Sequence, residues 1–311
     1  MNSSQTVADL FDILWQHYIA KMPQAKKIIA IVQAQGDVFI NDHVAFRTFG
    51  LPGLGIAALE QIFLKLGYKK MDYMNFADKK LNAYWYYPPD LTQPKVFISE
   101  IRVEKLSLTA QDLIKKYTQN SQTPIGEIDS ENSASISPFL STQARPWPRP
   151  MYVDYQRLAQ ESEYAAWVLA YGNELNHFTI SVNFLKNIKD IETLNHLLEA
   201  NGIKLNDAGG KIKGTPAELL MQSSTVADQV DFAFADGVHR IPYSYLEFAQ
   251  RFPMDPGSAA FAPTELPQAR GVHGKESEIP YTEYYQGFVP GNADKIFEST
   301  YRNQVKKNDA N

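Results

Sequence analysis

The spacing of apolar residues predicts helices at the start of the chain. Over residues 6–19 the apolar positions recur every three or four residues, at Val7, Leu10, Phe11, Leu14, Tyr18 and Ile19. This spacing is typical of one face of an amphipathic helix. A second helix is expected from Pro23 to about Gln35, because Gly36 follows it and glycine commonly ends helices. We therefore interpret residues 1–40 as N-terminal helices.

After residue 40 the pattern changes to strands around a single helix. Residues 42–49 are predicted as a strand, and residues 53–66 as a helix that ends at Gly67. Three more short runs rich in aromatic and β-branched residues predict strands at 69–76, 81–87 and 95–103. Residues 41–106 are thus expected to form a βαβββ unit.

The rest of the chain contains an insert, a second unit and a tail. Residues 107–172 are predicted as a helical insert with a Ser- and Pro-rich connection at 121–141. In the second unit, 173–252, we expect a strand at 176–184, a helix at 190–200 and strands at 219–223, 229–235 and 243–251. Residues 253–311 are rich in Pro, Gly and Ala near their start and are predicted as a wrapping tail or lid.

The two units share one order of elements, which indicates a diverged internal repeat. Each opens on a strand that carries a histidine, His43 in the first unit and His177 in the second. The predicted fold class is therefore α+β, with two βαβββ units, N-terminal helices, a helical insert and a long tail. We expect residues 1–311 to form a single catalytic domain.

Alternation along the opening strands places polar side chains on one face of the sheet. In the first strand, His43, Ala45 and Arg47 share a face. In the second strand, the residues of one face are polar (His177, Thr179, Ser181, Asn183) and those of the other are apolar (Phe178, Ile180, Val182, Phe184). If the two units pair, the two histidines converge on one polar cleft.

Two histidines in a cleft become a metal site when a carboxylate joins them. Glu247, in the last strand of the second unit, is the predicted third ligand, and Glu100 competes with it from the first unit. Two histidines and one carboxylate leave three positions open, as in non-haem Fe(II) oxygenases, although zinc or manganese suits the same ligands. Arg47 is either a clamp for a substrate carboxylate or a member of a surface ion pair.

Composition narrows the chemistry further. The 311 residues contain no cysteine and six histidines, and the formal net charge is −5. The lack of cysteine excludes disulfides, thiolate nucleophiles and iron–sulfur clusters, so a metal must use histidine, carboxylate or neutral oxygen ligands. The acidic balance argues against nucleic acid as a partner. Of the other histidines, His239 is expected in a hairpin turn and His273 in a loop.

The chain shows no targeting signal and no membrane segment. The start lacks a basic region followed by an apolar run, and the longest apolar stretch, near 164–171, is far shorter than the ~20 residues that span a bilayer. We therefore expect a soluble protein of the cytoplasm.

Four motifs resemble the 2-oxoadipate dioxygenase/decarboxylase family, whose fold is similar to vicinal oxygen chelate proteins. They are the segments His43–Phe49, Asn173–Thr179, Tyr245–Phe248 and Ile296–Ser299. The resemblance implies that His43, His177 and Glu247 bind Fe(II) and that Arg47 binds a substrate carboxylate. It also implies substrate binding at Gly291 and Asn292, where larger members carry a Val-Ser pair.

The same resemblance implies a reaction. Fe(II) and O2 would convert 2-oxoadipate to 2-hydroxyglutarate and CO2, a step in lysine breakdown. Two other hypotheses stay open at this stage. One is a zinc- or manganese-dependent lyase, isomerase or hydrolase on the same scaffold. The other is a non-catalytic protein that binds a small anion through Arg47.

Overall fold

The chain begins with two helices, as the apolar spacing predicted. The computed structural model describes residues 3–122, 128–254 and 281–306. The first helix is α1 (Ser3–Lys21), and the second is α2 (Pro23–Ala34). Pro23 stands in the first turn of α2, where a missing N–H removes no helical hydrogen bond. Within the three described ranges, no helix is long and apolar enough to cross a membrane.

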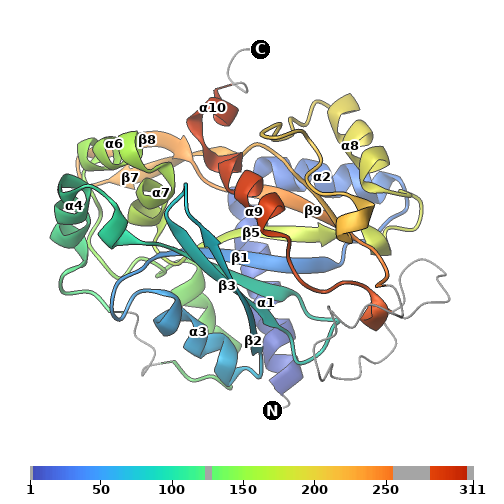
Figure 1. The fold of residues 1–311 in the computed structure, drawn as a ribbon, viewed down its shortest axis with the longest axis horizontal. Helices are drawn as coiled ribbons and strands as arrows, with labels where there is room; N and C mark the ends of the chain where they lie inside the picture. Colours follow the sequence, from blue (N-terminus) through green and yellow to red (C-terminus); the bar gives the residue numbers. More distant parts are fainter. Residues whose placement is uncertain (1–2, 123–127, 255–280, 307–311) are drawn as a thin grey trace.

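One seven-stranded sheet runs through both predicted units and forms the centre of the molecule (Figure 1). Its strands lie in the order β2, β3, β4, β1, β5, β9, β6. Their bounds are β1 (Asn41–Phe49), β2 (Lys69–Phe76), β3 (Leu81–Tyr87), β4 (Lys95–Ile101), β5 (Leu175–Ser181), β6 (Leu220–Ser224) and β9 (Tyr245–Arg251).

The sheet repeats one local arrangement on either side of its middle. The opening strands β1 and β5 pair with each other in antiparallel fashion at the centre. Each also has a parallel neighbour from its own unit, β4 beside β1 and β9 beside β5. An antiparallel strand then follows in each unit, β3 on β4 and β6 on β9. This arrangement confirms the predicted repeat and brings the two histidine-bearing strands together.

The second unit departs from the prediction at one strand. The sequence pattern predicts 229–235 as the middle strand of the unit, but β7 (Gln229–Phe234) pairs only with β8 (Gly237–Pro242), in a separate two-stranded sheet. An apolar pattern can predict that a strand forms, but it does not determine which strand will be its neighbour. The predicted turn position of His239 is also wrong, because this residue lies in β8 and stacks on Tyr152 with ring centroids 3.7 Å apart.

The remaining helices surround the sheet. The crossing helices of the two units are α3 (Ile56–Lys65) and α8 (Ile191–Ala200). The insert contains α4 (Leu108–Thr118), α5 (Ser133–Ile136), α6 (Tyr152–Glu161) and α7 (Glu163–Tyr171). Short 3-10 helices are η1 (Val103–Lys105), η3 (Ser137–Leu140), η4 (Val182–Phe184), η5 (Pro216–Glu218), η6 (Tyr281–Glu283) and η7 (Phe297–Thr300).

Three predicted elements have different limits in the structure. Within the predicted helical insert, residues 152–171 form two helices rather than one. They are separated at Ser162, whose hydroxyl accepts a hydrogen bond from the Ala165 N–H and so caps α7. The strand expected over 176–184 ends at Ser181 and continues as η4. The Ser- and Pro-rich connection 121–141 contains the short helices α5 and η3 among its described residues, and it buries Ile136 and Leu140.

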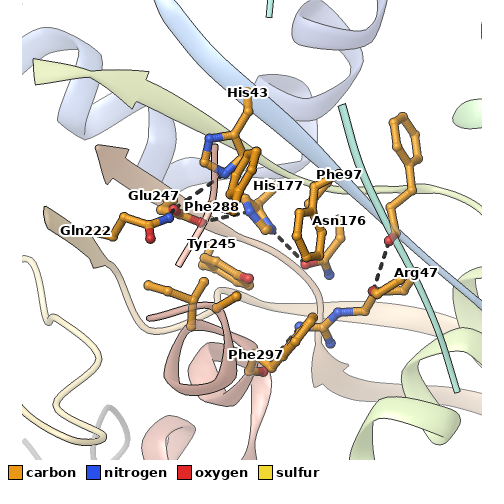
Figure 2. A pocket seen from close by; sticks show the side chains of 15 residues that line it. His43, Arg47, Phe97, Asn176, His177, Gln222, Tyr245, Glu247, Phe288 and Phe297 are labelled. Carbon is orange, nitrogen blue, oxygen red and sulfur yellow. Dashed lines mark hydrogen bonds and ion pairs between the residues drawn. The ribbon is translucent and has the colours of Figure 1, made fainter. Parts of the chain in front are cut away.

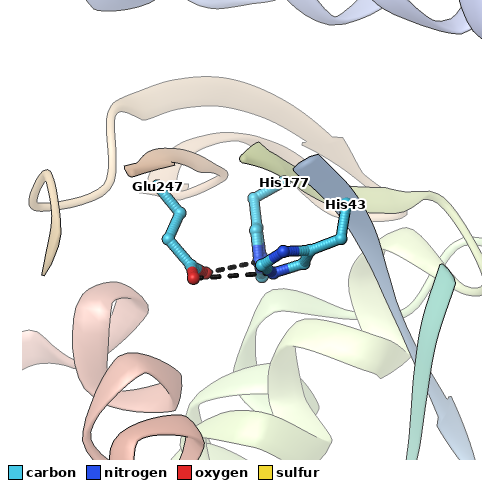
Figure 3. Close-up of side chains that lie close together, drawn as sticks. All are labelled: His43, His177 and Glu247. Atoms are coloured by element: carbon cyan, nitrogen blue, oxygen red, sulfur yellow. Dashed lines mark ion pairs between the residues drawn. The ribbon is translucent and has the colours of Figure 1, made fainter. Parts of the chain in front are cut away.

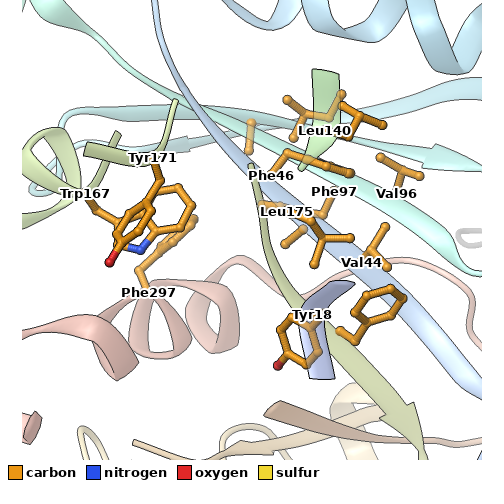
Figure 4. Close-up of a cluster of buried hydrophobic side chains, with 14 of the residues drawn as sticks. Tyr18, Val44, Phe46, Val96, Phe97, Leu140, Trp167, Tyr171, Leu175 and Phe297 are labelled. Carbon is orange, nitrogen blue, oxygen red and sulfur yellow. The ribbon is translucent and has the colours of Figure 1, made fainter. Parts of the chain in front are cut away.

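The apolar rows of the central strands pack against the N-terminal helices. Phe178 of β5 contacts Trp15 and Tyr18 of α1, with ring centroids 4.9 and 5.2 Å apart. Val44 and Phe46 of β1 are also fully buried in this core (Figure 4). Burial of the apolar row fixes which face of the sheet is left for the polar residues.

The tail returns to the sheet and closes its polar side. Helix α9 (Pro290–Ile296) contacts both edge strands, β2 and β6, so the sheet is curled and α9 lies across its opening (Figure 1). Lys79, in the turn between β2 and β3, binds Asp294 and Glu298 at 3.0 Å each. The short helix α10 (Arg302–Val305) follows η7. Much of the predicted lid, including His273, lies outside the described residues.

Candidate metal centre and substrate pocket

Three side chains that can bind a metal ion meet inside the curled sheet. They are His43 of β1, His177 of β5 and Glu247 of β9, and all three are buried (Figure 3). One ligand atom from each lies within 4.8 Å of the others. The structure therefore brings together the three residues that sequence analysis selected as ligands.

The ligand atoms point toward one another. His177 Nε2 lies 2.9 Å from one carboxylate oxygen of Glu247, and His43 Nε2 lies 3.5 Å from the other. Thr179 Oγ1 is 3.0 Å from His43 Nε2. The amide of Gln222, on the neighbouring strand β6, donates a 2.6 Å hydrogen bond to Glu247 Oε1 and holds the carboxylate in place.

An oxygen atom at the far side of each imidazole fixes its orientation. His43 Nδ1 lies 2.7 Å from Asp42 Oδ1, and His177 Nδ1 lies 2.9 Å from Asn176 Oδ1. A histidine that donates Nδ1–H to such an oxygen presents a free Nε2 lone pair, and this is the usual arrangement of metal-binding histidines. In both units, the side-chain oxygen of the preceding residue orients the histidine in this way.

Two β-bulges put these oxygen atoms where they are needed. The register of β1 against β5 shifts at two points, where Asp42 and Asn176 have no residue opposite them. A bulge re-aims a side chain that plain alternation would place on the other face. Each bulged residue thereby reaches the imidazole of the histidine that follows it. Sequence analysis missed both residues, because alternation assigned them to the opposite face.

Asp42 is itself held by a network of cationic and hydroxyl groups. Arg251 binds it with two hydrogen bonds, Nε to Oδ2 at 2.6 Å and Nη2 to Oδ1 at 2.8 Å. Lys95 Nζ lies 3.8 Å from Oδ2, and the Tyr281 hydroxyl donates to the same oxygen at 3.2 Å. These charges hold the pKa of Asp42 well below its usual value, although burial alone would raise it. Asp42 therefore stays ionised beside His43.

The charges of the site favour binding of a cation. Burial lowers the pKa of His177 to about 4, so its imidazole is neutral at pH 7. Burial alone would raise the pKa of Glu247, but the two imidazoles lower it to about 2, so the carboxylate is ionised. A neutral imidazole and an anionic carboxylate are the forms in which these side chains bind metals.

Glu100, the competing carboxylate, lies elsewhere. It accepts a 2.8 Å hydrogen bond from the Ile56 N–H and so caps the start of α3. In the sheet register Glu100 stands opposite Thr48, whereas Glu247 stands opposite Thr179, two residues past the histidine. The residue that corresponds to Glu247 in the first unit is therefore Phe97, opposite Ala45. The expectation that Glu100 is the equivalent of Glu247 is wrong by three residues.

Arg47 lies in the wall of the same pocket and is almost completely buried. Its guanidinium donates to Thr300 Oγ1 at 2.9 Å and to the Phe297 carbonyl at 3.2 Å. It also lies over the Tyr164 and Trp167 rings, at 5.1 and 5.4 Å from their centroids. No carboxylate within the described ranges forms an ion pair with it. The interpretation of Arg47 as part of a surface ion pair is wrong, because the side chain is not at the surface.

The pocket combines residues from both units and from the tail. The sheet supplies the polar wall, including Asn176 and Tyr245, and Ala45 and Arg47 share it with His43, as alternation predicted (Figure 2). The tail supplies four further residues: Phe288, Ala293, Ile296 and Phe297. Phe288 packs edge-on against His43, with ring centroids 4.8 Å apart. No periodic pattern in the sequence pointed to these tail residues.

Gly291 and Asn292 lie next to this wall rather than in it. Asn292 is buried, and its amide donates to the Leu220 carbonyl at 3.2 Å. A Cβ atom built on Gly291 meets no other atom within 4 Å. The lining residues from this part of the chain are Ala293, Ile296 and Phe297. A substrate-binding role for Gly291 and Asn292 stays a prediction.

A divalent metal ion fits this donor set. Two imidazole nitrogens and one anionic carboxylate converge, and each of the three side chains is supported by a hydrogen bond from behind. Burial alone would lower the pKa of His43, but the negative charges of Glu247 and Asp42 raise it, so a cation bound at this site would replace a proton on His43. Among the residues that the structure describes, the Glu247 carboxylate pairs with the two histidines and with no lysine or arginine. Two histidines and a carboxylate on a rigid sheet leave coordination positions open toward the pocket, as oxygen-activating Fe(II) sites require.

Comparison with known proteins then identifies the family. Residues 3–264 match the model of the 2-oxoadipate dioxygenase/decarboxylase family. The chain belongs to this family. One relative, the chloroplastic 2-oxoadipate dioxygenase/decarboxylase of Arabidopsis thaliana, is 41% identical over 325 residues, covering 98% of this chain and 82% of the relative. Because that relative is chloroplastic, the predicted cytoplasmic location is not confirmed for this family member.

Two solved structures confirm the fold class. The hydroxyglutarate synthase of Oryza sativa, determined in complex with 2-oxoadipate, superposes with a TM-score of 0.82 at 37% identity, covering 98% of this chain and 94% of the other. A protein of the glyoxalase superfamily from Ralstonia eutropha has a TM-score of 0.70 at 24% identity, covering 80% and 84% of the two chains. The second likeness shows the fold alone.

Proposed function

We propose that this 2-oxoadipate dioxygenase/decarboxylase family member uses Fe(II) and O2 to convert 2-oxoadipate to 2-hydroxyglutarate and CO2. The proposal is carried by one buried pocket that contains both the His43–His177–Glu247 group and Arg47, which has no anionic partner among residues 3–122, 128–254 and 281–306. Such a pocket suits a molecule with a metal-chelating end and a distant negative charge. The names of the Arabidopsis relative and of the rice structure support this substrate.

His43, His177 and Glu247 would hold the metal, and bound Fe(II) supplies both the chelation of a 2-oxo acid and the activation of O2. The protein holds these ligands ready for the metal. Asp42 and Asn176 orient the two imidazoles, and Gln222 holds the carboxylate. Ligands fixed in this way need little rearrangement when the metal binds.

Arg47 would bind the carboxylate at the far end of the substrate. Its guanidinium is fixed by Thr300 and by the Phe297 carbonyl, both from the tail. A planar guanidinium can bind a carboxylate through two parallel hydrogen bonds, which fixes orientation as well as charge. Arg47 would thereby set the length of diacid that reaches the metal.

The tail would exclude water from the reaction. Phe288 and Phe297 place aromatic rings on the open side of the sheet, and both side chains are buried. An apolar enclosure strengthens electrostatic contacts and protects reactive species from side reactions. One molecule of O2 balances the reaction: one atom enters the new carboxylate, the other enters the new hydroxyl group, and the original carboxylate leaves as CO2.

The decisive experiment is O2 uptake by protein prepared without air and loaded with Fe(II). With 2-oxoadipate and a reductant, we expect one CO2 and one 2-hydroxyglutarate for each O2 consumed. Protein loaded with zinc or manganese serves as the matched control and should consume none. The proposal also includes iron as the metal, a role in lysine breakdown and a location in the cytoplasm.

Three results would contradict the proposal. The first is an absence of O2 uptake with every C5 and C6 2-oxo diacid. The second is turnover by zinc- or manganese-loaded protein in air-free buffer, which would indicate a lyase, isomerase or hydrolase. The third is tight diacid binding that survives His177→Ala without any turnover, which would indicate a binding protein.

A further inference from the structure

Three polar atoms in the pocket wall are buried and form no hydrogen bond with any residue that the structure describes. They are Asn176 Nδ2, Gln222 Oε1 and the Tyr245 hydroxyl oxygen. Nearly all buried polar atoms in folded proteins are paired, because an unpaired one forfeits the hydrogen bonds that it makes with water. Unpaired atoms that face one pocket therefore indicate the polar groups of its ligand.

Neighbouring contacts fix which of these atoms donate. Asn176 Oδ1 accepts from His177 Nδ1–H when Nε2 binds a metal, so Asn176 Nδ2 is an NH2 donor facing the pocket. Gln222 uses its NH2 group on Glu247, so its free atom is an acceptor. The hydroxyl of Tyr245 can donate. The pocket thus offers two uncharged donors in addition to Arg47.

Tyr245 connects the metal group with Arg47. It stands opposite His177 in the pairing of β5 with β9, and the two rings stack with centroids 4.4 Å apart. Burial raises the pKa of Tyr245 above its usual range, and the positive charge of Arg47 and the approach of its guanidinium to the hydroxyl oxygen oppose that rise. An N–H group directed at this oxygen leaves the O–H of Tyr245 available as a donor. Figure 2 shows Asn176 between His177 and Arg47, with Tyr245 beside the same imidazole.

We propose that the Tyr245 hydroxyl and the Asn176 NH2 group donate hydrogen bonds to the same substrate carboxylate that Arg47 binds. The three residues together select 2-oxo dicarboxylates over 2-oxo monocarboxylates. This inference rests on the proposed function, because it assigns the far end of the same substrate. A buried carboxylate can accept about four hydrogen bonds, and one guanidinium supplies only two of them.

The preference for a diacid follows from the polar groups of the pocket that a monocarboxylate cannot bind. A 2-oxo monoacid of equal length places a methyl group against Arg47, Tyr245 and Asn176. The Asn176 NH2 group and the Tyr245 hydroxyl then donate to nothing, and the charge of Arg47 has no anion beside it. Sites built to hydrogen-bond a substrate group discriminate strongly against analogues that lack it. Contact with apolar walls alone cannot discriminate to that extent.

The test compares Tyr245→Phe with Tyr171→Phe. Tyr171 is the matched control because its hydroxyl is also buried and unpaired, yet it does not line the pocket. Binding of 2-oxoadipate and of 2-oxohexanoate is measured by calorimetry on zinc-loaded protein without O2. The two ligands have identical chelating ends, so their difference reports only the far end.

We expect Tyr245→Phe to weaken 2-oxoadipate binding about 10- to 100-fold, the range for a hydrogen bond to a charged group. Binding of 2-oxohexanoate should change less than about threefold. The ligand-free Tyr245→Phe variant should melt no lower than the parent, because the change removes an unpaired buried hydroxyl. Tyr171→Phe should leave the preference between the two ligands unchanged.

Asn176→Asp gives an independent check. The substitution keeps an oxygen acceptor for His177 and replaces the NH2 donor with a second carboxylate oxygen. We expect the variant to bind zinc to the parent's stoichiometry and to lose its preference for the diacid, since a negative oxygen repels the substrate carboxylate.

The outcomes separate this inference from the proposed function. If the parent prefers the diacid and both variants keep that preference, the inference is overturned and the proposed function stands. If the parent binds 2-oxohexanoate as tightly as 2-oxoadipate, the inference is overturned, and O2 uptake with 2-oxoadipate tests the proposed function separately. If the diacid preference depends on Tyr245 but iron-loaded protein consumes no O2, the carboxylate site is supported and the proposed reaction fails.

Discussion

At the scale of single residues, the site depends on groups that hold each ligand atom from behind. Asp42 and Asn176 orient the two imidazoles, and Gln222 holds Glu247. The proposed metal affinity is therefore a property of six side chains rather than three. Outer partners of this kind are typically responsible for 10- to 100-fold in metal affinity.

The two carboxylates of the sequence analysis can be separated by substitution. We expect Glu247→Ala to lower metal affinity by more than about 100-fold, since loss of an outer partner alone costs up to that factor. Metal content after anaerobic loading and dialysis measures the effect. Glu100→Ala is the control: it should keep its metal and lose about 1 kcal/mol of stability, because it removes the cap of α3. Metal loss in Glu100→Ala alone would move the ligand to the first unit.

At the scale of secondary-structure elements, a buried carboxylate connects helices α4 and α6 of the insert. Asp154 of α6 accepts hydrogen bonds from Lys116 at 2.6 Å and Tyr117 at 2.7 Å, both from the end of α4. Burial would raise the pKa of Asp154, but these bonds lower it below the ordinary value. The ionised carboxylate therefore stabilises the contact between the two helices.

The lowered pKa predicts a pH dependence of stability. A carboxylate whose pKa is depressed by folding stabilises above its unfolded pKa of about 4 and loses that effect as the pH falls toward the folded pKa. Asp154→Asn should lower the free energy of unfolding by about 1–2 kcal/mol at pH 7. The difference from the parent should shrink at pH 3. Urea unfolding at the two pH values measures it, and an equal difference at both would contradict the assignment.

Predictability also differs between elements. Alternation placed His43, Ala45 and Arg47 in one pocket because that stretch of strand is regular. Alternation failed for Asn176, because a bulge arises from the pairing between two strands and does not change the pattern of apolar and polar residues in either strand. Tyr245 shares a strand face with Glu247, so alternation could have identified it as a pocket residue, although it was not among the predicted site residues. Residues 229–234 form a strand as predicted, but this strand pairs with the next strand in a hairpin instead of joining the main sheet.

At the scale of the whole molecule, the Arg251–Asp42 ion pair connects the tail with the predicted metal site. Arg251 binds Asp42 and also donates to the carbonyls of Tyr285 and Gly287, at 3.0 and 2.8 Å. The next residue, Phe288, packs on His43. Docking of the tail and orientation of His43 therefore depend on the same guanidinium. Contacts between residues so far apart in sequence could not be predicted from local patterns.

Removal of this guanidinium should weaken the molecule as a whole. Arg251→Gln leaves the Asp42 carboxylate buried with less compensation, and we expect a loss of about 3–5 kcal/mol in the free energy of unfolding. The double variant Asp42→Asn with Arg251→Gln should recover part of that loss, because no unpaired charge remains. Lys211→Gln, at the exposed Lys211–Glu199 pair, should cost less than about 1 kcal/mol. Additive losses in the double variant would argue against coupling between Asp42 and Arg251.

In the proposed reaction, one pocket inserts both atoms of O2 into a single 2-oxo diacid. The most direct test is turnover of 2-oxoadipate under 18O2 by iron-loaded protein, with mass analysis of the product. We predict 2-hydroxyglutarate heavier by four mass units, with one label in the new carboxylate and one in the hydroxyl group. An unlabelled product, or substrate consumed without O2, would contradict the account.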